Sequence, residues 1–158
     1  MKPLYIFDLD GTIANVDHRL YILNSDDDDK WERFFNLCVF DEPIIPVITT
    51  LKHLRSSGAD IWIWTGRSDQ VIQETKDWLW LLEDVVMDSA HLKEPYLKMR
   101  REGYYKSDHA LKRKWFDAMS DEDRSRLVAV FEDRKKVVDM WRDAGVTCFQ
   151  VAADGAGQ

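Results

Sequence analysis

Phe7-Asp8-Leu9-Asp10-Gly11-Thr12 closes a short apolar run, Leu4 to Phe7, near the start of the chain. A β-rich run that ends at acids and a glycine predicts a buried strand followed by a sharp turn. Asp8 and Asp10 are two positions apart, so their carboxylates can face the same side of the chain. Gly11 permits the turn and exposes backbone N–H groups to an anion. This stretch therefore predicts the first strand of a domain that binds phosphate at a strand end.

Two later apolar runs also end in polar side chains. Ile61 to Trp64 leads into Thr65-Gly66-Arg67, and Leu127 to Phe131 leads into Glu132-Asp133. Ligands of open α/β sheets bind beyond the carboxyl ends of the strands. We therefore expect these polar groups to meet the first acidic pair in one crevice.

Stretches of helical period separate the strand-like runs. Val47 to Leu54 precedes Ser57-Gly58, and Arg134 to Ala144 precedes Gly145, where a glycine can close a helix. Val146 to Val151 reads as a last strand. The alternation predicts an α/β domain with a parallel sheet. Val85-Val86-Met87 and Tyr96 to Met99 compete for one more strand, and we favour Tyr96 to Met99.

The stretch from Asp17 to Asp41 does not follow this alternation and predicts a small cap inserted after the first strand. Its acidic run, Asp26 to Asp29, favours a solvated loop over a metal site, because like charges repel. The segment is rich in aromatic side chains, namely Tyr21, Trp31, Phe34 and Phe35. These rings would either stack on a base or seal the cap.

Size and composition predict one soluble domain over residues 1–158. No apolar window approaches the roughly 18 residues of a membrane span, and the N-terminus lacks the features of a secretion signal, so we expect a cytoplasmic protein that does not contact membranes. Cys38 and Cys148 have no metal-type spacing and predict buried free thiols. The net charge of −7 opposes wide binding along a polyanion, so any contact with nucleic acid should be local.

The paired carboxylates predict phosphoryl transfer. Asp8 can attack phosphorus as a covalent nucleophile, while Asp10 can protonate the leaving oxygen and then activate water. Two carboxylates and a phosphate repel one another, so a hard cation such as Mg²⁺ is needed. We predict that Asp8 and Asp10 hold this ion and that Asp133 completes its shell.

The string Asp8-Leu9-Asp10-Gly11-Thr12 resembles the first motif of the haloacid dehalogenase superfamily, whose phosphatases form an aspartyl-phosphate. The resemblance implies a Rossmann-like sheet with helices on both faces. Thr65 resembles the second motif, Lys112 the third, and Glu132-Asp133 the fourth. The resemblance adds Glu132 to the metal site, although the family usually has Asp at this position.

A second resemblance, to the 3'-phosphatase domain of phage polynucleotide kinases, covers nearly the whole chain. It rests mainly on Phe131 to Arg142 with the following Gly145, Cys148 and Gln150 to Ala152, and on Met99 to Lys112. The family's arginine eleven positions after the nucleophile falls on Arg19. Its acid four residues before the lysine falls on Asp108.

Each of these residues has an expected role. Thr65 and the backbone at Gly66 would bind phosphate oxygens, and Lys112 would stabilise the transition state. Asp108, one helical turn from Lys112, would orient it. The guanidinium groups of Arg19 and Arg67 suit bidentate phosphate contact.

These observations favour a Mg²⁺-dependent phosphomonoesterase that acts on a nucleotide or on the 3' end of a nucleic acid. A 5'- or 3'-mononucleotidase is the alternative enzyme, and a non-catalytic phosphate-binding module is disfavoured by the intact motifs. No Gly-x-x-x-x-Gly-Lys-[Ser/Thr] loop is present, so we expect no kinase activity from this chain. The resemblance implies nucleic-acid end-healing, with a phage as one origin; the preferred ester and the oligomeric state stay open.

Overall fold

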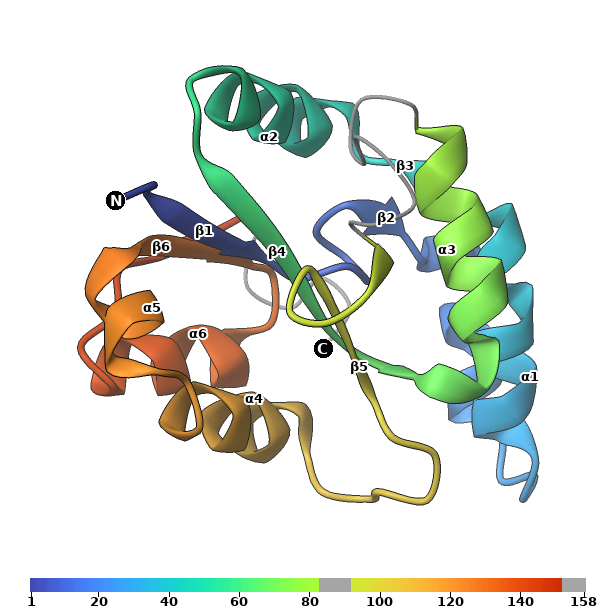
Figure 1. The fold of residues 1–158 in the computed structure, drawn as a ribbon. Helices are drawn as coiled ribbons and strands as arrows, with labels where there is room; N and C mark the ends of the chain where they lie inside the picture. The colour runs from blue at the N-terminus through green and yellow to red at the C-terminus, as the bar shows by residue number, and fades with distance from the viewer. Residues whose placement is uncertain (83–91, 152–158) are drawn as a thin grey trace.

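Five parallel strands form the centre of the computed structural model, which describes residues 1–82 and 92–151 (Figure 1). Their order is β5-β4-β1-β6-β7, and every neighbouring pair is parallel. The strands are β1 (Leu4–Phe7), β4 (Asp60–Ser68), β5 (Leu97–Arg100), β6 (Leu127–Glu132) and β7 (Cys148–Gln150). The predicted α/β fold with a parallel sheet is confirmed.

Alternation along β1 divides the apolar core between the two faces of the sheet. Phe7 packs in a cluster with side chains of α2 (Ile45–Ser56) and α3 (Ile72–Leu81). Leu4 and Ile6 pack on the other face, against α4 (Asp108–Asp117) and α6 (Lys135–Asp143). The short α5 (Asp121–Arg126) lies between α4 and β6 in the chain. Figure 1 shows the resulting layers, with α2 above the sheet and α4 and α6 below it.

The expected elements are present with shifted bounds. The strand predicted at Ile61 to Trp64 continues to Ser68, and the one predicted at Tyr96 to Met99 runs one residue later. The last strand is shorter than predicted. The rival run Val85-Val86-Met87 and the residues from 152 onward lie outside the described residues.

Residues 17–41, here called the inserted segment, lie between two short antiparallel strands, β2 (Ala14–Asn15) and β3 (Glu42–Pro43). The segment contains the 3-10 helix η1 (Asp17–Asn24), the helix α1 (Lys30–Asn36) and the 3-10 helix η2 (Leu37–Phe40). Its buried side chains form a small separate cluster with Val71 of η3 (Asp69–Val71), just ahead of α3. Figure 1 shows α1 and α3 on the same side of the molecule.

Five tryptophans of the sheet and its covering helices are buried, namely Trp62, Trp64, Trp78, Trp115 and Trp141. Trp80 is the exception, because 53% of its surface is exposed on α3. Trp78 and Trp80 are two residues apart on one helix, so they point to different sides. A helical run can bury only one of the two.

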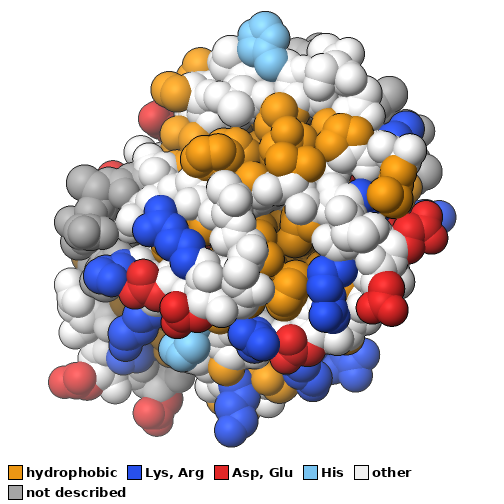
Figure 2. All heavy atoms as spheres, turned by 90° about the vertical axis from the view of Figure 1, so that its left-hand side faces the viewer, with side chains coloured by type: hydrophobic (Ala, Val, Ile, Leu, Met, Phe, Trp, Pro, Cys, Tyr) orange, Lys and Arg blue, Asp and Glu red, His pale blue; other side chains and the backbone are white. Residues whose placement is uncertain are grey.

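The surface mixes apolar and charged areas. Figure 2 shows hydrophobic side chains gathered in the middle of one face, with lysines, arginines and acids interspersed below them. No broad surface of positive charge appears on that face. Across residues 1–82 and 92–151, no helix is both long and apolar enough to cross a membrane.

Replacing Trp141 by Ala should lower the free energy of unfolding by about 3–5 kcal/mol, because it removes a fully buried ring from between the sheet and α6. Trp80→Ala should change stability far less. Urea denaturation followed by circular dichroism measures both. Equal losses for the two variants would contradict the assigned core.

Candidate active site

Adjacent strands bring the predicted acids together. Phe7 lies level with Phe131 on one side and with Ile63 on the other. Asp8, which follows Phe7, therefore lies beside Glu132 and Asp133 at the carboxyl edge of the sheet. The three carboxylates have oxygen atoms within 4.8 Å of one another, and all three residues are buried.

The turn after β1 closes against this acidic group. Gly11 has a φ of +82°, which an L side chain rarely adopts, and a Cβ atom built on it would lie 2.1 Å from Asp133 Oδ2. The Thr12 hydroxyl is 3.3 Å from Asp133 Oδ1 and 3.5 Å from Asp8 Oδ2. The turn thus needs a glycine for two reasons, its backbone conformation and the closeness of Asp133.

Lys112 reaches the acidic group from α4. Its Nζ donates to Asp8 Oδ1 at 2.6 Å and to Glu132 Oε2 at 2.7 Å, and its side chain is 3% exposed. Glu132 Oε1 in turn accepts from the backbone N–H of Asp133 at 3.1 Å. The lysine is therefore an internal cation and contacts the predicted nucleophile directly.

One lysine does not neutralise three carboxylates, and the pKa values reflect this. Burial, followed by the charge of Glu132, raises the pKa of Asp8 to about 8 against the pull of Lys112. Burial and Asp8 raise the pKa of Asp133 to about 7. Burial also raises the pKa of Glu132. For Lys112, burial favours the neutral form, but Asp8 and Glu132 prevail and raise its pKa.

This donor set fits a hard divalent cation. Buried carboxylate oxygens at close range are the ligands that Mg²⁺ and similar ions prefer, and a cation would relieve the repulsion among them. The side chain of Asp10, predicted as a further ligand, lies among arginines instead of in this group. Its part in metal binding stays a prediction.

Asp10 belongs to a second cluster, in which charges balance. Its Oδ1 accepts from Arg19 Nη2 at 3.1 Å and from Arg67 Nε at 3.1 Å, with Arg67 Nη2 in still closer contact. Asp41 accepts from Arg19 Nε at 2.8 Å and Nη2 at 2.6 Å, and from Arg67 Nη2 at 3.1 Å. Two buried arginines thus face two acids.

The arginines set the protonation of Asp10. Burial alone would raise its pKa, but the charges of Arg67 and Arg19 and their hydrogen bonds hold the pKa below its usual range. Asp10 is therefore a carboxylate in this arrangement. The forks of Arg19 and Arg67, predicted to bind phosphate, point at carboxylates in the same arrangement.

The predicted phosphate-binding strand end lies next to this cluster. Thr65 is fully buried, and its Oγ1 accepts from the backbone N–H of Arg67 at 3.0 Å. Gly66 contacts Asp108 so closely that a Cβ would lie 2.1 Å from Oδ1. Arg100 Nε donates to the Gly66 carbonyl at 2.8 Å. The geometry brings Thr65 and Gly66 to the same edge of the sheet as Asp8.

Asp108 does not hydrogen-bond Lys112. Its carboxylate binds Arg100 Nη2 through Oδ1 and Arg134 Nη1 through Oδ2, the latter at 2.5 Å. The charge of Asp108 nevertheless contributes to the raised pKa of Lys112. Asp108 thus acts on Lys112 through space, while it bridges the start of α4 to β5 and to the start of α6.

Sequence reasoning did not single out three residues of these networks: Asp41, Arg100 and Arg134. Asp41 was only the boundary of the inserted segment, and Arg100 and Arg134 only parts of longer matching stretches. No sequence spacing links these residues to their partners. Asp41, for example, lies 22 positions from its partner Arg19. Only folding brings them into contact.

The aromatic residues of the inserted segment divide into two groups. Phe34 and Phe35 are buried in its core, so these rings seal the segment. Trp31 packs against both and is 52% exposed, while Tyr21 is 65% exposed. In the acidic run, Asp27 pairs with Arg33 at the surface, as expected for a solvated loop.

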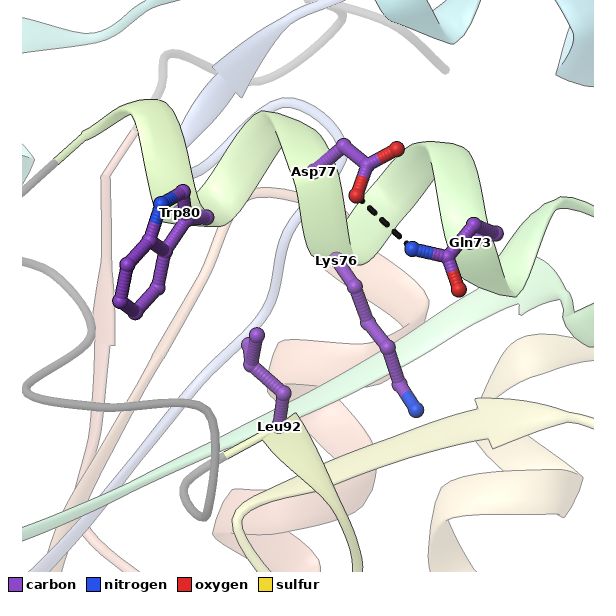
Figure 3. A pocket seen from close by; sticks show the side chains of 5 residues that line it. All are labelled: Gln73, Lys76, Asp77, Trp80 and Leu92. Carbon is purple, nitrogen blue, oxygen red and sulfur yellow. Dashed lines mark hydrogen bonds between the residues drawn. The ribbon is translucent and has the colours of Figure 1, made fainter.

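A groove on α3 is separate from the acidic site. It has a volume of about 420 Å³ and is lined by Gln73, Lys76, Asp77, Trp80 and Leu92 (Figure 3). Gln73 donates to Asp77 at 2.8 Å along the helix. None of the predicted site residues lines this groove, so it does not carry the chemistry.

The comparisons with known proteins agree with this geometry. The family model described as the polynucleotide kinase PNKP phosphatase domain matches residues 2–155. A protein of Autographa californica nuclear polyhedrosis virus, named "Putative bifunctional polynucleotide kinase/RNA ligase", is 32% identical over 149 residues, which are 93% of this chain and 19% of that protein.

Solved structures with a similar fold include a repair-complex chain and an acid phosphatase. A chain in the structure of the Pnkp1/Rnl/Hen1 RNA repair complex is 25% identical, with a TM-score of 0.70, over 95% of this chain and 42% of that one. A class C acid phosphatase from Bacillus anthracis shares the fold, at 16% identity and a TM-score of 0.59, over 91% of this chain and 62% of the other. The chain thus spans about a fifth of the viral relative and less than half of the repair-complex chain.

Fold and site together define a phosphoric monoester hydrolase of the haloacid dehalogenase type, a class in which a divalent metal is general. Within this class, the chain belongs to the family of polynucleotide kinase phosphatase domains.

Gly11→Ala should destabilise the protein more than Gly58→Ala. Both glycines have positive φ, so both variants bear a left-handed backbone cost of about 1–2 kcal/mol. Only Gly11 faces a side chain, whereas nothing lies within 4 Å of a Cβ at Gly58. Urea denaturation should show the excess loss in Gly11→Ala. Equal losses would mean that Asp133 moves aside without cost.

Proposed function

We propose that the chain is a Mg²⁺-dependent phosphomonoesterase in which Asp8 forms a transient aspartyl-phosphate. The observation that carries this proposal is the buried group of Asp8, Glu132 and Asp133 around Lys112 at the strand ends. The Asp8 carboxylate there has the Lys112 ammonium at 2.6 Å, and the carboxylates of Glu132 and Asp133 lie beside it as possible metal ligands.

Charge balance supports a divalent ion in this group. With Lys112 protonated and all three acids ionised, the group carries two excess negative charges, which one divalent cation neutralises. Asp8, Asp133 and Glu132 would provide its protein ligands. When bound, the ion would screen the phosphate from the carboxylates and polarise a phosphoryl oxygen.

The proposed reaction has two steps, in which these residues take different roles. A carboxylate oxygen of Asp8 attacks phosphorus, the bond from phosphorus to the ester oxygen breaks, and Asp10 gives its proton to the departing alcohol. In the second step Asp10 accepts a proton from water, whose oxygen attacks phosphorus and releases Asp8 and inorganic phosphate. Lys112 and Thr65 stabilise the charge on the transferring phosphoryl oxygens.

This assignment requires Asp10 to hold a proton, although Arg19 and Arg67 favour its carboxylate form. A bound phosphate offers the same two arginines a competing anion with suitable geometry. As their hydrogen bonds turn from Asp10 toward phosphate, the pKa of Asp10 rises. Substrate binding would in this way prepare the acid.

The proposed substrate is the 3'-phosphate end of a nucleic acid. The family, the viral polynucleotide kinase/RNA ligase and the RNA repair complex support a nucleic-acid end as the substrate class. The net charge of −7 favours contact with a chain end over contact along a polyanion. The same charge favours a mononucleotidase as the second candidate. The inserted segment would act as a small cap beside the site, in a cytoplasmic enzyme for which a phage is one origin.

Magnesium should stabilise the folded protein through the acidic group. Millimolar Mg²⁺ should raise the melting temperature, with a gain of about 2.7 kcal/mol at a hundredfold excess over the dissociation constant. Asp133→Asn should lose most of this gain, because it removes one charged ligand. Differential scanning fluorimetry measures the shift.

Asp143→Asn is the matched control, since Asp143 is an exposed acid at the end of α6. It should keep the full response to Mg²⁺. A response in Asp133→Asn equal to that of the wild type would contradict the assigned metal site.

Phosphate release with Mg²⁺ tests the activity itself. The substrates are a 3'-phosphorylated oligonucleotide, the 5'-phosphorylated form and the matching mononucleotides. We expect the 3'-phosphorylated oligonucleotide to be preferred, and Asp8→Asn to lower turnover by at least about a thousandfold, because an amide does not replace the nucleophile.

Asp143→Asn should again match the wild type. Release from mononucleotides alone would make the protein a nucleotidase. No release from any of these substrates with metal present would overturn the catalytic proposal and favour a phosphate-binding module.

A further inference from the structure

The loop from 101 to 107 joins β5 to α4 at the carboxyl edge of the sheet, at the lower edge of Figure 1. Arg100 fixes its backbone. The Nη1 atom of Arg100 donates to the carbonyl oxygens of Tyr104 at 3.0 Å and of Lys106 at 2.5 Å. The main chain is therefore held on both sides of Tyr105.

The two tyrosines of this loop differ sharply in environment. Tyr104 is partly buried against the core below the sheet, with Lys114 Nζ 5.2 Å from its ring centroid. Tyr105 is 94% exposed, more than any other large apolar or aromatic side chain within the described residues. A fixed backbone thus presents an unpacked aromatic ring to solvent, which packing of the fold does not explain.

The anchor of the loop also contacts residues beside the proposed active site. Arg100 Nε donates to the carbonyl of Gly66 at 2.8 Å, and its Nη2 binds Asp108. Lys112 follows Asp108 by one helical turn and contacts Asp8 at 2.6 Å. Through Arg100, the backbone on both sides of Tyr105 is therefore tied to Gly66 and Asp108, beside the strand ends where the phosphate would bind.

Exposed cations lie close to Tyr105 in the chain, together with one exposed acid, Glu102. Arg101 and Lys106 are exposed in the same loop, and the side chain of Arg134, on Asp108, is 46% exposed. An aromatic ring among exposed cations is the arrangement that binds single-stranded nucleic acid, because bases stack on the ring while cations meet phosphates.

We propose that Tyr105 stacks on the nucleobase adjacent to the phosphate that is removed, and so determines specificity for nucleotide ends over simple phosphate esters. This inference rests on the proposed phosphatase function. The rival platform is Tyr21 in the inserted segment, which is 65% exposed. Tyr105 is favoured because Arg100 ties its loop directly to Gly66 and Asp108.

The test compares Tyr105→Ala and Tyr105→Phe with Tyr21→Ala. The substrates are a 3'-phosphorylated oligonucleotide, the same oligonucleotide with an abasic last unit, and glycerol phosphate. Tyr105→Ala should raise KM for the base-bearing end by about tenfold to a hundredfold, the range for the loss of one stacked base, with kcat little changed.

The other arms separate stacking from a structural effect. Tyr105→Phe, which keeps the ring, and Tyr21→Ala should match the wild type, and Tyr105→Ala should be unaffected on the abasic and glycerol substrates. An unchanged KM for Tyr105→Ala, or the loss in Tyr21→Ala instead, would overturn the inference while the phosphatase function stood.

Equilibrium binding tests the inference without turnover. Fluorescence anisotropy of the labelled 3'-phosphorylated oligonucleotide should show weaker binding to Tyr105→Ala and wild-type binding to Tyr105→Phe. If the wild type released no phosphate from any substrate, the proposed function would fail. The binding result would then still decide whether Tyr105 stacks: equal affinities for the two variants would refute it.

Discussion

The ammonium group of Lys112, held between Asp8 and Glu132, lets the domain bury an excess of acids at the end of its sheet. Removing charges from water costs several kcal/mol each unless partners compensate. Lys112 compensates only in part, and burial together with the remaining repulsion raises the pKa values of Asp8 and Asp133. This unfinished neutralisation makes the site receptive to a divalent cation.

The second charge cluster behaves differently because its charges balance. Arg19 and Arg67 face Asp10 and Asp41, and every one of these side chains has hydrogen-bond partners. The cluster joins β4, the turn after β1 and the inserted segment. Moving either arginine toward a phosphate would change the protonation of Asp10 and the hold on the inserted segment together. If Asp10 transfers the proton as proposed, that step is linked to the position of this segment.

A third network, around Asp108, connects the edge of the sheet to the surface. Arg100 and Arg134 converge on this carboxylate, while Arg100 also holds the loop that carries Tyr105. The close contact of Asp108 with Gly66 requires the absence of a side chain there. The groups that fix α4, which carries Lys112, therefore also hold the surface loop that carries Tyr105.

The parallel α/β fold and the meeting of strand ends could be predicted from the sequence, because hydrophobic period and terminal polar residues are local signals. The sequence also predicted which acids follow β1 and β6. Folding places the Asp10 side chain with Arg19, Arg67 and Asp41. It also buries Phe34 and Phe35 in the inserted segment and leaves Tyr105 in solvent. The physical reason is that hydrogen bonds and burial depend on distances between residues far apart in the chain, which no local pattern encodes.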